Sequence, residues 1–323
     1  MVIPSRLLDD LLARISGARR VICLTHKNPD GDAVGSLLGM GMMIERRFPD
    51  IEVHYFNKDK INGMFRFLPG CNKVENSISS EEGDLYIFLD SAEPKLIGIE
   101  EEYPHVFDGR FPSINIDHHP TNALFAGVNI LVPDACSACE ILYYLALSLD
   151  WQLSGDIATC LLTGVYTDTG GLLHSNTTVS AYRTSAALLR AGARHQEIIR
   201  AMFRTSSVNT LKLWGKVLEG ISITDEGAAV SAVKEDDFRA AGAHFAQLTG
   251  VVDYVNSVPG TRFSMILSER EGLVKGSLRT LRDDVDVSKM AAKFNGGGHK
   301  RAAGFSVPGK LKSEVRWKIV ESK

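Results

Sequence analysis

One loop near the N-terminus holds His26, Asp30 and Asp32 within seven positions. Imidazole and carboxylate groups bind divalent metals of the Mn, Mg, Fe or Zn kind. Pro29 and Gly31 favour a tight turn that directs the two aspartates separately. A carboxylate in such a loop can also cap the helix that follows, because the first amides of a helix lack partners. For this loop taken alone, metal binding and helix capping both remain open.

Two more aspartates lie where apolar segments end. Asp90 follows the apolar run 84–89, and Asp168 closes a stretch over 157–168 whose apolar residues have helical spacing. Alone, Asp90 can be a cap at a strand end, and Asp168 can be an ordinary surface acid. Their recurrence after the first loop favours a shared metal site.

The strongest local signal is Asp117-His118-His119-Pro120, at the end of the apolar segment 113–116. An acid beside two histidines can orient one imidazole through its second nitrogen, as metal-bound histidine usually requires. Pro120 stops the strand and stiffens the turn. Satisfied core histidines are the alternative, and three chain segments that end in ligand-type residues argue against it.

The elements that must position these residues follow from the apolar periodicity. The carboxyl ends of parallel strands meet at one sheet edge, where open α/β sheets bind their ligands. We therefore expect an N-terminal α/β domain with a parallel sheet. Its predicted strands are 21–24, 51–56, 84–89 and 113–116, and its predicted helices include 33–47 and 157–168.

A second, smaller α/β domain with a mixed sheet is predicted beyond Gly192. Two helices come first, and short alternating segments joined by a turn at 225–227 follow them. The expected division is a domain over 1–192, a helical linker over 193–219 and a domain over 220–323. The predicted elements are helices 196–204, 208–219 and 288–294 and strands 220–224, 228–233, 262–268 and 273–279.

Two features of the second domain suit an anion. Arg279 ends a predicted strand with a guanidinium group, which clamps phosphate through paired hydrogen bonds. Gly296, Gly297 and Gly298 predict a flexible loop whose amides approach an anion closely, and His299 can donate to it. A plain glycine turn is the alternative.

Composition narrows the class of protein. The chain has 323 residues, of which 44% are hydrophobic and 23% charged, as in globular proteins. Residues 272–323 carry 12 Lys+Arg against 5 Asp+Glu (+7), so residues 1–271 carry 24 against 34 (−10). An acidic part suits metals and a basic part suits an anion. No signal peptide, membrane span or disulfide framework is expected, and we predict a cytoplasmic protein with reduced cysteines.

The ordered set of His26, Asp30 and Asp32, then Asp90, then Asp117-His118-His119, then Asp168 resembles the DHH phosphoesterase family. Ser277-Leu278-Arg279, Gly296 to His299 and Ala302-Ala303-Gly304 resemble the C-terminal domain associated with it. Among these proteins, the chain is most similar to the bacterial type that degrades very short RNAs and dephosphorylates adenosine 3′,5′-bisphosphate (pAp). One departure is Asp134–Glu140, where the family often has a Ser/Thr-rich helix start.

The resemblance implies roles for the residues that match. One metal is held by His26, Asp30 and Asp90, and a second by Asp32, Asp90, His118 and Asp168, with Asp90 as the bridge. His119 faces the substrate phosphate and Asp117 orients its neighbours, so Asp90, Asp117, His118 and His119 are the catalytic group. His119, Arg279, Gly296, Gly297, Gly298 and His299 contact substrate.

The implied function is hydrolysis of short oligonucleotides of RNA or DNA, of dinucleotides or of pAp. Two Mn²⁺ ions per site are expected, with Mg²⁺ possible, and a homodimer is suggested. A pyrophosphatase or exopolyphosphatase with a related site is the first alternative. A nucleotide-binding module without catalysis is the second.

Overall fold

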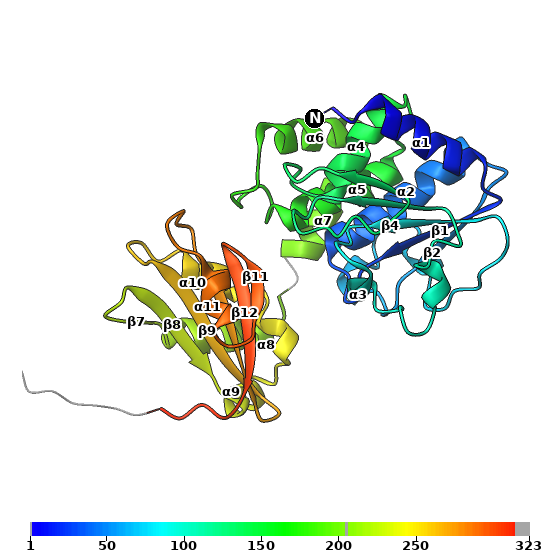
Figure 1. Ribbon diagram of the computed structural model, residues 1–323. Coiled ribbons are helices and arrows are strands. Elements are labelled where there is room, and N and C mark those ends of the chain that lie inside the picture. Colours follow the sequence, from blue (N-terminus) through cyan, green and yellow to red (C-terminus); the bar gives the residue numbers. More distant parts are fainter. Residues whose placement is uncertain (1, 204–205, 314–323) are drawn as a thin grey trace, which may run out of the picture. The chain divides into compact units, whose positions relative to one another are not determined.

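The computed structural model describes residues 2–203 and 206–313, and the chain divides into two compact units, 1–205 and 206–323. Each unit has its own sheet and core (Figure 1). None of the described helices is long and apolar enough to cross a membrane.

The first unit is built on a six-stranded parallel sheet in the order β3-β2-β1-β4-β5-β6. The order reverses between the central strands β1 and β4, which is the switch point where doubly wound sheets bind ligands. The predicted parallel sheet is confirmed. Its strands are β1 (Arg20–Thr25), β2 (Glu52–Phe56), β3 (Val74–Glu75), β4 (Asp84–Leu89), β5 (Ser113–Asp117) and β6 (Val128–Leu131).

Both faces of this sheet are covered by other parts of the unit. Successive side chains of a strand point to opposite faces, so each strand contributes to two cores. Val21 and Cys23 of β1 join a core with the long helices, while Ile22 and Leu24 pack beneath α3 and its loops. Figure 1 places α2, α4 and α5 together and α3 apart from them. The helices are α1 (Ser5–Ser16), α2 (Gly31–Arg47), α3 (Pro94–Ile97), α4 (Ala138–Ser148), α5 (Gly155–Asp168), α6 (Val179–Arg190) and α7 (His195–Phe203).

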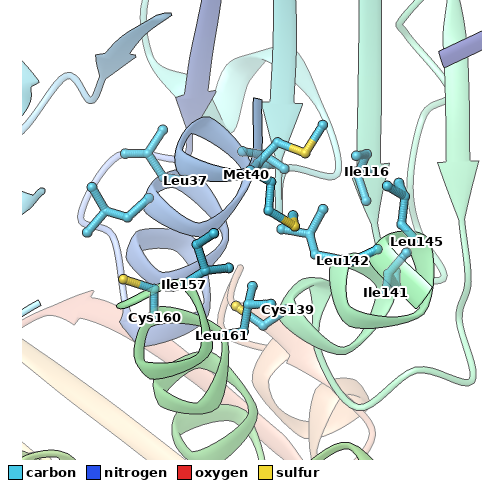
Figure 2. Close-up of a cluster of buried hydrophobic side chains, with 14 of the residues drawn as sticks. Leu37, Met40, Ile116, Cys139, Ile141, Leu142, Leu145, Ile157, Cys160 and Leu161 are labelled. Carbon is cyan, nitrogen blue, oxygen red and sulfur yellow. The ribbon is translucent and has the colours of Figure 1, made fainter. Parts of the chain in front are cut away.

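Helices α2, α4 and α5 pack closely against one another in the core of the first unit. Figure 2 shows side chains of these helices meeting in one apolar cluster, with Cys139 and Leu142 from α4, Leu37 and Met40 from α2, and Leu161 from α5. The close approach of the helices rests on small residues at their contacts, so that backbone and side chains touch directly.

The second unit has a mixed six-stranded sheet in the order β11-β12-β10-β9-β8-β7, in which β8 and β9 run parallel and the other neighbours antiparallel. The predicted mixed sheet is confirmed. The strands are β7 (Ser222–Ile223), β8 (Ala228–Val233), β9 (Phe263–Arg270), β10 (Leu273–Arg279), β11 (Gly297–His299) and β12 (Ala302–Pro308). The helices are α8 (Val208–Glu219), α9 (Glu235–Ala241), α10 (Val251–Asn256) and α11 (Val287–Ala292).

The segment 193–219, predicted as a helical linker, contains the helices α7 and α8. Ile198 of α7 is buried in the core of the first unit, whereas Leu213 and Val217 of α8 are buried in the core of the second. The predicted linker is therefore shared between the two units, and the division falls between its helices. The end of the predicted helix 196–204, residue 204, lies outside the described residues.

Candidate metal centre

His26 comes directly after β1, and its ring is held in one orientation. Its Nδ1–H donates to the Lys27 carbonyl oxygen at 2.9 Å, so Nε2 is the nitrogen that faces the carboxylates and that can bind a cation once its proton is lost. This Nε2 lies 3.5 Å from Asp90 Oδ2 and 3.9 Å from Asp30 Oδ1. Asn57 fixes the loop by donating from Nδ2 to the His26 carbonyl oxygen at 2.8 Å. His26 can therefore share a cation with both carboxylates.

Asp30 caps α2, as the alternative interpretation of this loop predicts. Its Oδ1 accepts hydrogen bonds from the amides of Asp32 and Ala33, both at 3.0 Å. The same carboxylate faces His26, so capping does not exclude a ligand role. Because the cap bonds use one oxygen, the other remains available to a cation.

Asp32 does not cap the helix that contains it. Its fully buried carboxylate accepts from the amides of Ala138, at 2.6 Å, and Cys139, at 2.9 Å, in the first turn of α4. A helix N-terminus is a favourable place for a negative charge. Helix capping as the role of this loop is therefore wrong for Asp32, because the amides that Asp32 binds lie more than 100 positions further along the chain.

Asp90 stands at the centre of the group. It follows β4, has the left-handed backbone angle φ of 51° and is 2% exposed. Its Oδ2 faces His26 and its Oδ1 lies 3.5 Å from His118 Nε2. Among the described residues, Asp90 Oδ1 has no hydrogen-bond partner although it is buried. A buried oxygen without a partner is costly, which suits an atom that binds a cation.

His118 gathers the remaining carboxylates. Its Nδ1–H donates to the Ala135 carbonyl oxygen at 3.3 Å. Its Nε2 then points to Asp168 Oδ2 at 3.3 Å and to Asp32 Oδ2 at 4.0 Å. This nitrogen, too, is buried and without a hydrogen-bond partner in the part of the chain that the structure describes.

His119 is held beside this group by a buried acid. Its Nδ1 lies 2.8 Å from Asp117 Oδ1, and the other oxygen of Asp117 accepts from Asn122 Nδ2 at 2.6 Å. Asn122 also donates to Asn115 Oδ1 at 3.2 Å. The sequence interpretation missed Asn122, whose only signal is an amide five residues after the acid that it contacts.

The charges of the centre compensate one another. Burial lowers the pKa of His26, but Asp90 and Asp30 outweigh it and raise that pKa to about 9. Burial likewise lowers the pKa of His118, and Asp90 with Asp32 raises it to about 10. Burial raises the pKa of Asp90, yet the facing imidazoles of His118 and His26 hold it below the usual range.

The pKa values of Asp168 and Asp32 are both raised, and burial is the largest cause for each. Burial and the neighbouring carboxylates raise the pKa of Asp168 well above its ordinary value. The pKa of Asp32 rises to about 7, first through burial and then through the charge of Asp90. Protons therefore balance the crowded carboxylates here, and a divalent cation would replace them.

The donor set fits divalent metal ions. Three groups of described residues each place one ligand atom per residue within 4.8 Å of one another. Carboxylate oxygen with imidazole nitrogen and no thiolate suits Mn²⁺ or Mg²⁺ better than a closed structural zinc site. The groups are His26, Asp30 and Asp90; Asp32, His118 and Asp168; and Asp90, Asp117, His118 and His119.

The substrate residues predicted in the second unit are Arg279 and the segment Gly296 to His299. Arg279 ends β10, where its Nη1 donates to the Leu278 carbonyl oxygen at 3.0 Å and its Nε lies 3.9 Å from Asp253 Oδ1. Its guanidinium group is partly exposed, so an anion can reach it.

The predicted flexible glycine loop is instead a hairpin, because Gly297 to His299 form β11 and pair with β12. Gly296 is required for packing, since a Cβ there would meet the Gly304 carbonyl oxygen at 2.3 Å and Phe305 Cβ at 2.6 Å. A Cβ on Gly297 would meet nothing within 4 Å. The side chain of His299 lies outside the described residues.

Fold and site together define a class of two-unit α/β proteins with a cluster of carboxylates and histidines, suited to metal ions, at the carboxyl edge of a parallel sheet. Residues 20–165 match the DHH family, N-terminal domain, and residues 225–321 match the DHHA1 domain. The chain belongs to the DHH family.

Curated relatives and solved structures agree with this assignment. The chain is 32% identical to the bifunctional oligoribonuclease and PAP phosphatase NrnA of Thermus thermophilus, over 98% of this chain and 92% of that protein. It is 27% identical to NrnA of Bacillus subtilis, over 92% of each chain. An exopolyphosphatase-related protein from Bacteroides fragilis matches at 25% identity with a TM-score of 0.86, over 97% of this chain and 93% of that one.

Proposed function

We propose that this protein is a metal-dependent phosphoesterase that hydrolyses short oligonucleotides to mononucleotides and pAp to AMP. The observation that carries the proposal is the position of Asp90 between two ligand groups, one with His26 and one with His118. Such an arrangement suits two cations that share one carboxylate. The names of the relatives supply the substrate class.

We infer two Mn²⁺ ions per site, with Mg²⁺ as the other candidate. His26, Asp30 and Asp90 would hold the first, and Asp32, Asp90, His118 and Asp168 the second. When bound, two divalent cations lower the pKa of a water molecule, align a phosphoester for attack and offset the charge on the leaving oxygen. Phosphoester hydrolysis needs little else of the protein beyond positioning and charge.

His119 has a separate role in this proposal. Its Nδ1 is held by Asp117, so its Nε2 can donate to a phosphate oxygen. Burial lowers the pKa of His119, but the hydrogen bond to Asp117 raises it above the ordinary value. A charged imidazolium that donates to the phosphate stabilises its negative charge, and Asp117 keeps the ring in position.

The second unit is proposed to bind the nucleotide part of the substrate. Arg279 provides a partly exposed guanidinium group. The strand Gly297–His299 provides backbone amides, and at Gly297 and Gly298 no side chain shields the backbone. Gly296 is proposed to shape the start of this strand. His299 remains a predicted substrate contact.

Hydrolysis of pyrophosphate or polyphosphate is the second candidate. The observation in its favour is the likeness to the exopolyphosphatase-related protein, which extends over nearly the whole of both chains. The NrnA relatives favour nucleotides instead, because they match this chain over nearly its whole length at 27–32% identity.

Product analysis with the purified protein tests the proposal. The protein is incubated with Mn²⁺ and, separately, pAp, a 5′-phosphorylated diadenylate and pyrophosphate, with Asp90→Ala as control. AMP from either nucleotide, absent with the variant, is the expected result. Orthophosphate from pyrophosphate alone would favour the second candidate, and no turnover of any substrate would leave a nucleotide-binding module. A homodimer and a cytoplasmic location stay predictions.

A further inference from the structure

The start of α4 contacts the residues proposed to hold the second metal. We call Ala135–Glu140 the cradle segment. Its Ala135 carbonyl oxygen accepts from His118 Nδ1, which turns His118 Nε2 toward the carboxylates. Its amides at Ala138 and Cys139 donate to the two oxygens of Asp32. One short segment therefore sets the orientation of two ligands.

A third ligand is tied to the same segment by Asn176. The Asn176 Nδ2 group donates to the carbonyl oxygen of Cys136 at 3.2 Å and to that of Asp168 at 3.1 Å. This amide therefore links the cradle segment to the end of α5, where Asp168 stands. All three members of the Asp32, His118 and Asp168 group are held through residues 135–139.

Glu140 fixes the conformation of this segment. Its Oε2 accepts from the Cys136 amide at 2.7 Å, and its own amide donates to Ser137 Oγ at 3.0 Å. These two bonds close the start of α4 on itself, much as a capping box does, but with the Glu140 side chain bound to the amide one residue before the N-cap Ser137. The cradle segment is thus held from inside by one side chain.

The burial of Glu140 is costly. Its side chain is fully buried, and Oε1 has no hydrogen-bond partner among the described residues. An apolar residue would pack at this position without that cost. A carboxylate that lowers stability here is therefore better explained by what it positions.

The cradle segment has no room to shift. Figure 2 shows the Cys139 side chain within the apolar cluster between α2, α4 and α5. A Cβ added at Gly164 of α5 would lie 2.3 Å from Cys139 Sγ, and one at Gly35 of α2 would lie 3.1 Å from it. Packing thus fixes one end of the segment, and Glu140 fixes the other.

We propose that Glu140 is a positioning residue that sets the geometry of the Asp32, His118 and Asp168 metal site. The inference rests on the metal dependence in the proposed function and deepens it. The His26, Asp30 and Asp90 group is held by other contacts, from Asn57 and from the start of α2. Loss of Glu140 therefore weakens one metal site and spares the other.

The test is a titration of the metal-free, full-length protein with Mn²⁺ by calorimetry. Glu140→Ala is expected to weaken one of two binding events ten- to hundredfold, the usual effect of removing a group that orients ligands. Glu140→Gln keeps one acceptor oxygen for the Cys136 amide, so its affinities should stay within about threefold of the parent. Electron paramagnetic resonance of the Mn²⁺-loaded samples should show coupled ions in the parent and in Glu140→Gln but not in Glu140→Ala.

Ser154→Ala is the matched control. Ser154 Oγ accepts from the Ile157 amide at 3.3 Å and caps α5 at the end opposite Asp168. Its loss removes a cap, at a cost of about 1 kcal/mol in stability, but touches no ligand. Both Mn²⁺ affinities should be unchanged in this variant, and a weakened site here would overturn the inference.

Asn176→Ala covers the case in which Glu140→Ala does not fold, because Asn176 is exposed and its loss leaves the core intact. It should weaken the same binding event as Glu140→Ala. An equal loss of Mn²⁺ affinity at both sites, or no loss of affinity in either variant, overturns the role of the cradle segment. Turnover of pAp by the parent would still support the proposed function in that case. A parent that binds no Mn²⁺ overturns both.

Discussion

Substituting Gly164 by Ala places a methyl group where α5 meets the metal centre. The added Cβ would lie 2.3 Å from Cys139 Sγ and 2.5 Å from Asp32 Oδ1. Neither neighbour can withdraw, because Asp32 is held by two amides of α4 and Cys139 is packed in the core. A normal contact is roughly 3.5–4.0 Å, so Asp32 or α4 must move by about 1 Å.

The magnitude follows from two opposing effects. Forcing a methyl group into a packed core costs typically ~1–3 kcal/mol. Replacing glycine by alanine inside a helix returns up to about 1 kcal/mol. Gly215 of α8 is the matched position, since a Cβ there meets nothing within 4 Å. Both variants gain the helix preference of alanine, so Gly164→Ala should be less stable than Gly215→Ala by the overpacking cost alone, roughly 1–3 kcal/mol.

Urea denaturation of the two variants and the parent, each free of metal, measures this difference. Turnover of pAp should fall by up to about a hundredfold in Gly164→Ala, because a 1 Å displacement of a ligand disturbs the reacting geometry, and stay at the parental level in Gly215→Ala. Equal stability of the two variants, or full activity of Gly164→Ala, would refute the close packing described for Asp32.

Three other changes have defined outcomes. Asp90→Asn should lower turnover roughly a thousandfold, about 4 kcal/mol, and reduce bound Mn²⁺, as measured by steady-state kinetics and metal analysis; near-parental rates would contradict the shared carboxylate. In the metal-free protein, the raised pKa of His26 gives stability that is complete below the ordinary pKa of 6.5 and is lost as the pH rises through about 9. Melting temperatures measured with EDTA should therefore fall over this window, while the affinity for Mn²⁺ rises. An affinity for Mn²⁺ that does not depend on pH would show that protons do not compete with the metal. Arg279→Ala should raise KM for pAp about tenfold or more, since a hydrogen bond to a charged group is worth ~1.5–3 kcal/mol, and an unchanged KM would remove Arg279 from the substrate site.

The strand ends of the first unit were open to prediction because their signal is local. A buried parallel strand is an uninterrupted apolar run, so the residue that ends it is visible in the sequence. Parallel strands of one sheet must bring these residues to one edge. Asp90 and His118 could therefore be grouped without knowledge of the strand order.

The contacts that orient the ligands could not be found in this way. Asp32 accepts from Ala138 and Cys139, which lie 106 and 107 positions away. Nothing in the local pattern joins these segments, because the contact arises from the crossing of α2 and α4. Asn176 was missed because it contacts Cys136, 40 positions away. Glu140 leaves a local signal, the Ser137-x-x-Glu140 pattern of a helix start, but that pattern does not show which ligands the turn orients.

The glycines of the second unit misled the prediction for a different reason. A run of three glycines is typical of a flexible loop, since glycine has little conformational preference. Here Gly296 makes room for Phe305, and Gly298 takes a backbone angle φ of 137° within a paired strand. The local glycine pattern does not show that β12 packs directly against this segment.

The left-handed backbone at Asp90 has a consequence for the choice of an inactive protein in experiments. A side chain in that region is strained, whereas glycine adopts it freely. Asp90→Gly therefore removes the shared carboxylate and relaxes the chain at once. The released strain offsets part of the stability that is lost with the charge pairs to His26 and His118, so Asp90→Gly should resist heat better than Asp90→Ala, which keeps the strain. The fold thus accepts backbone strain at Asp90, and this strained position keeps a carboxylate between His26 and His118.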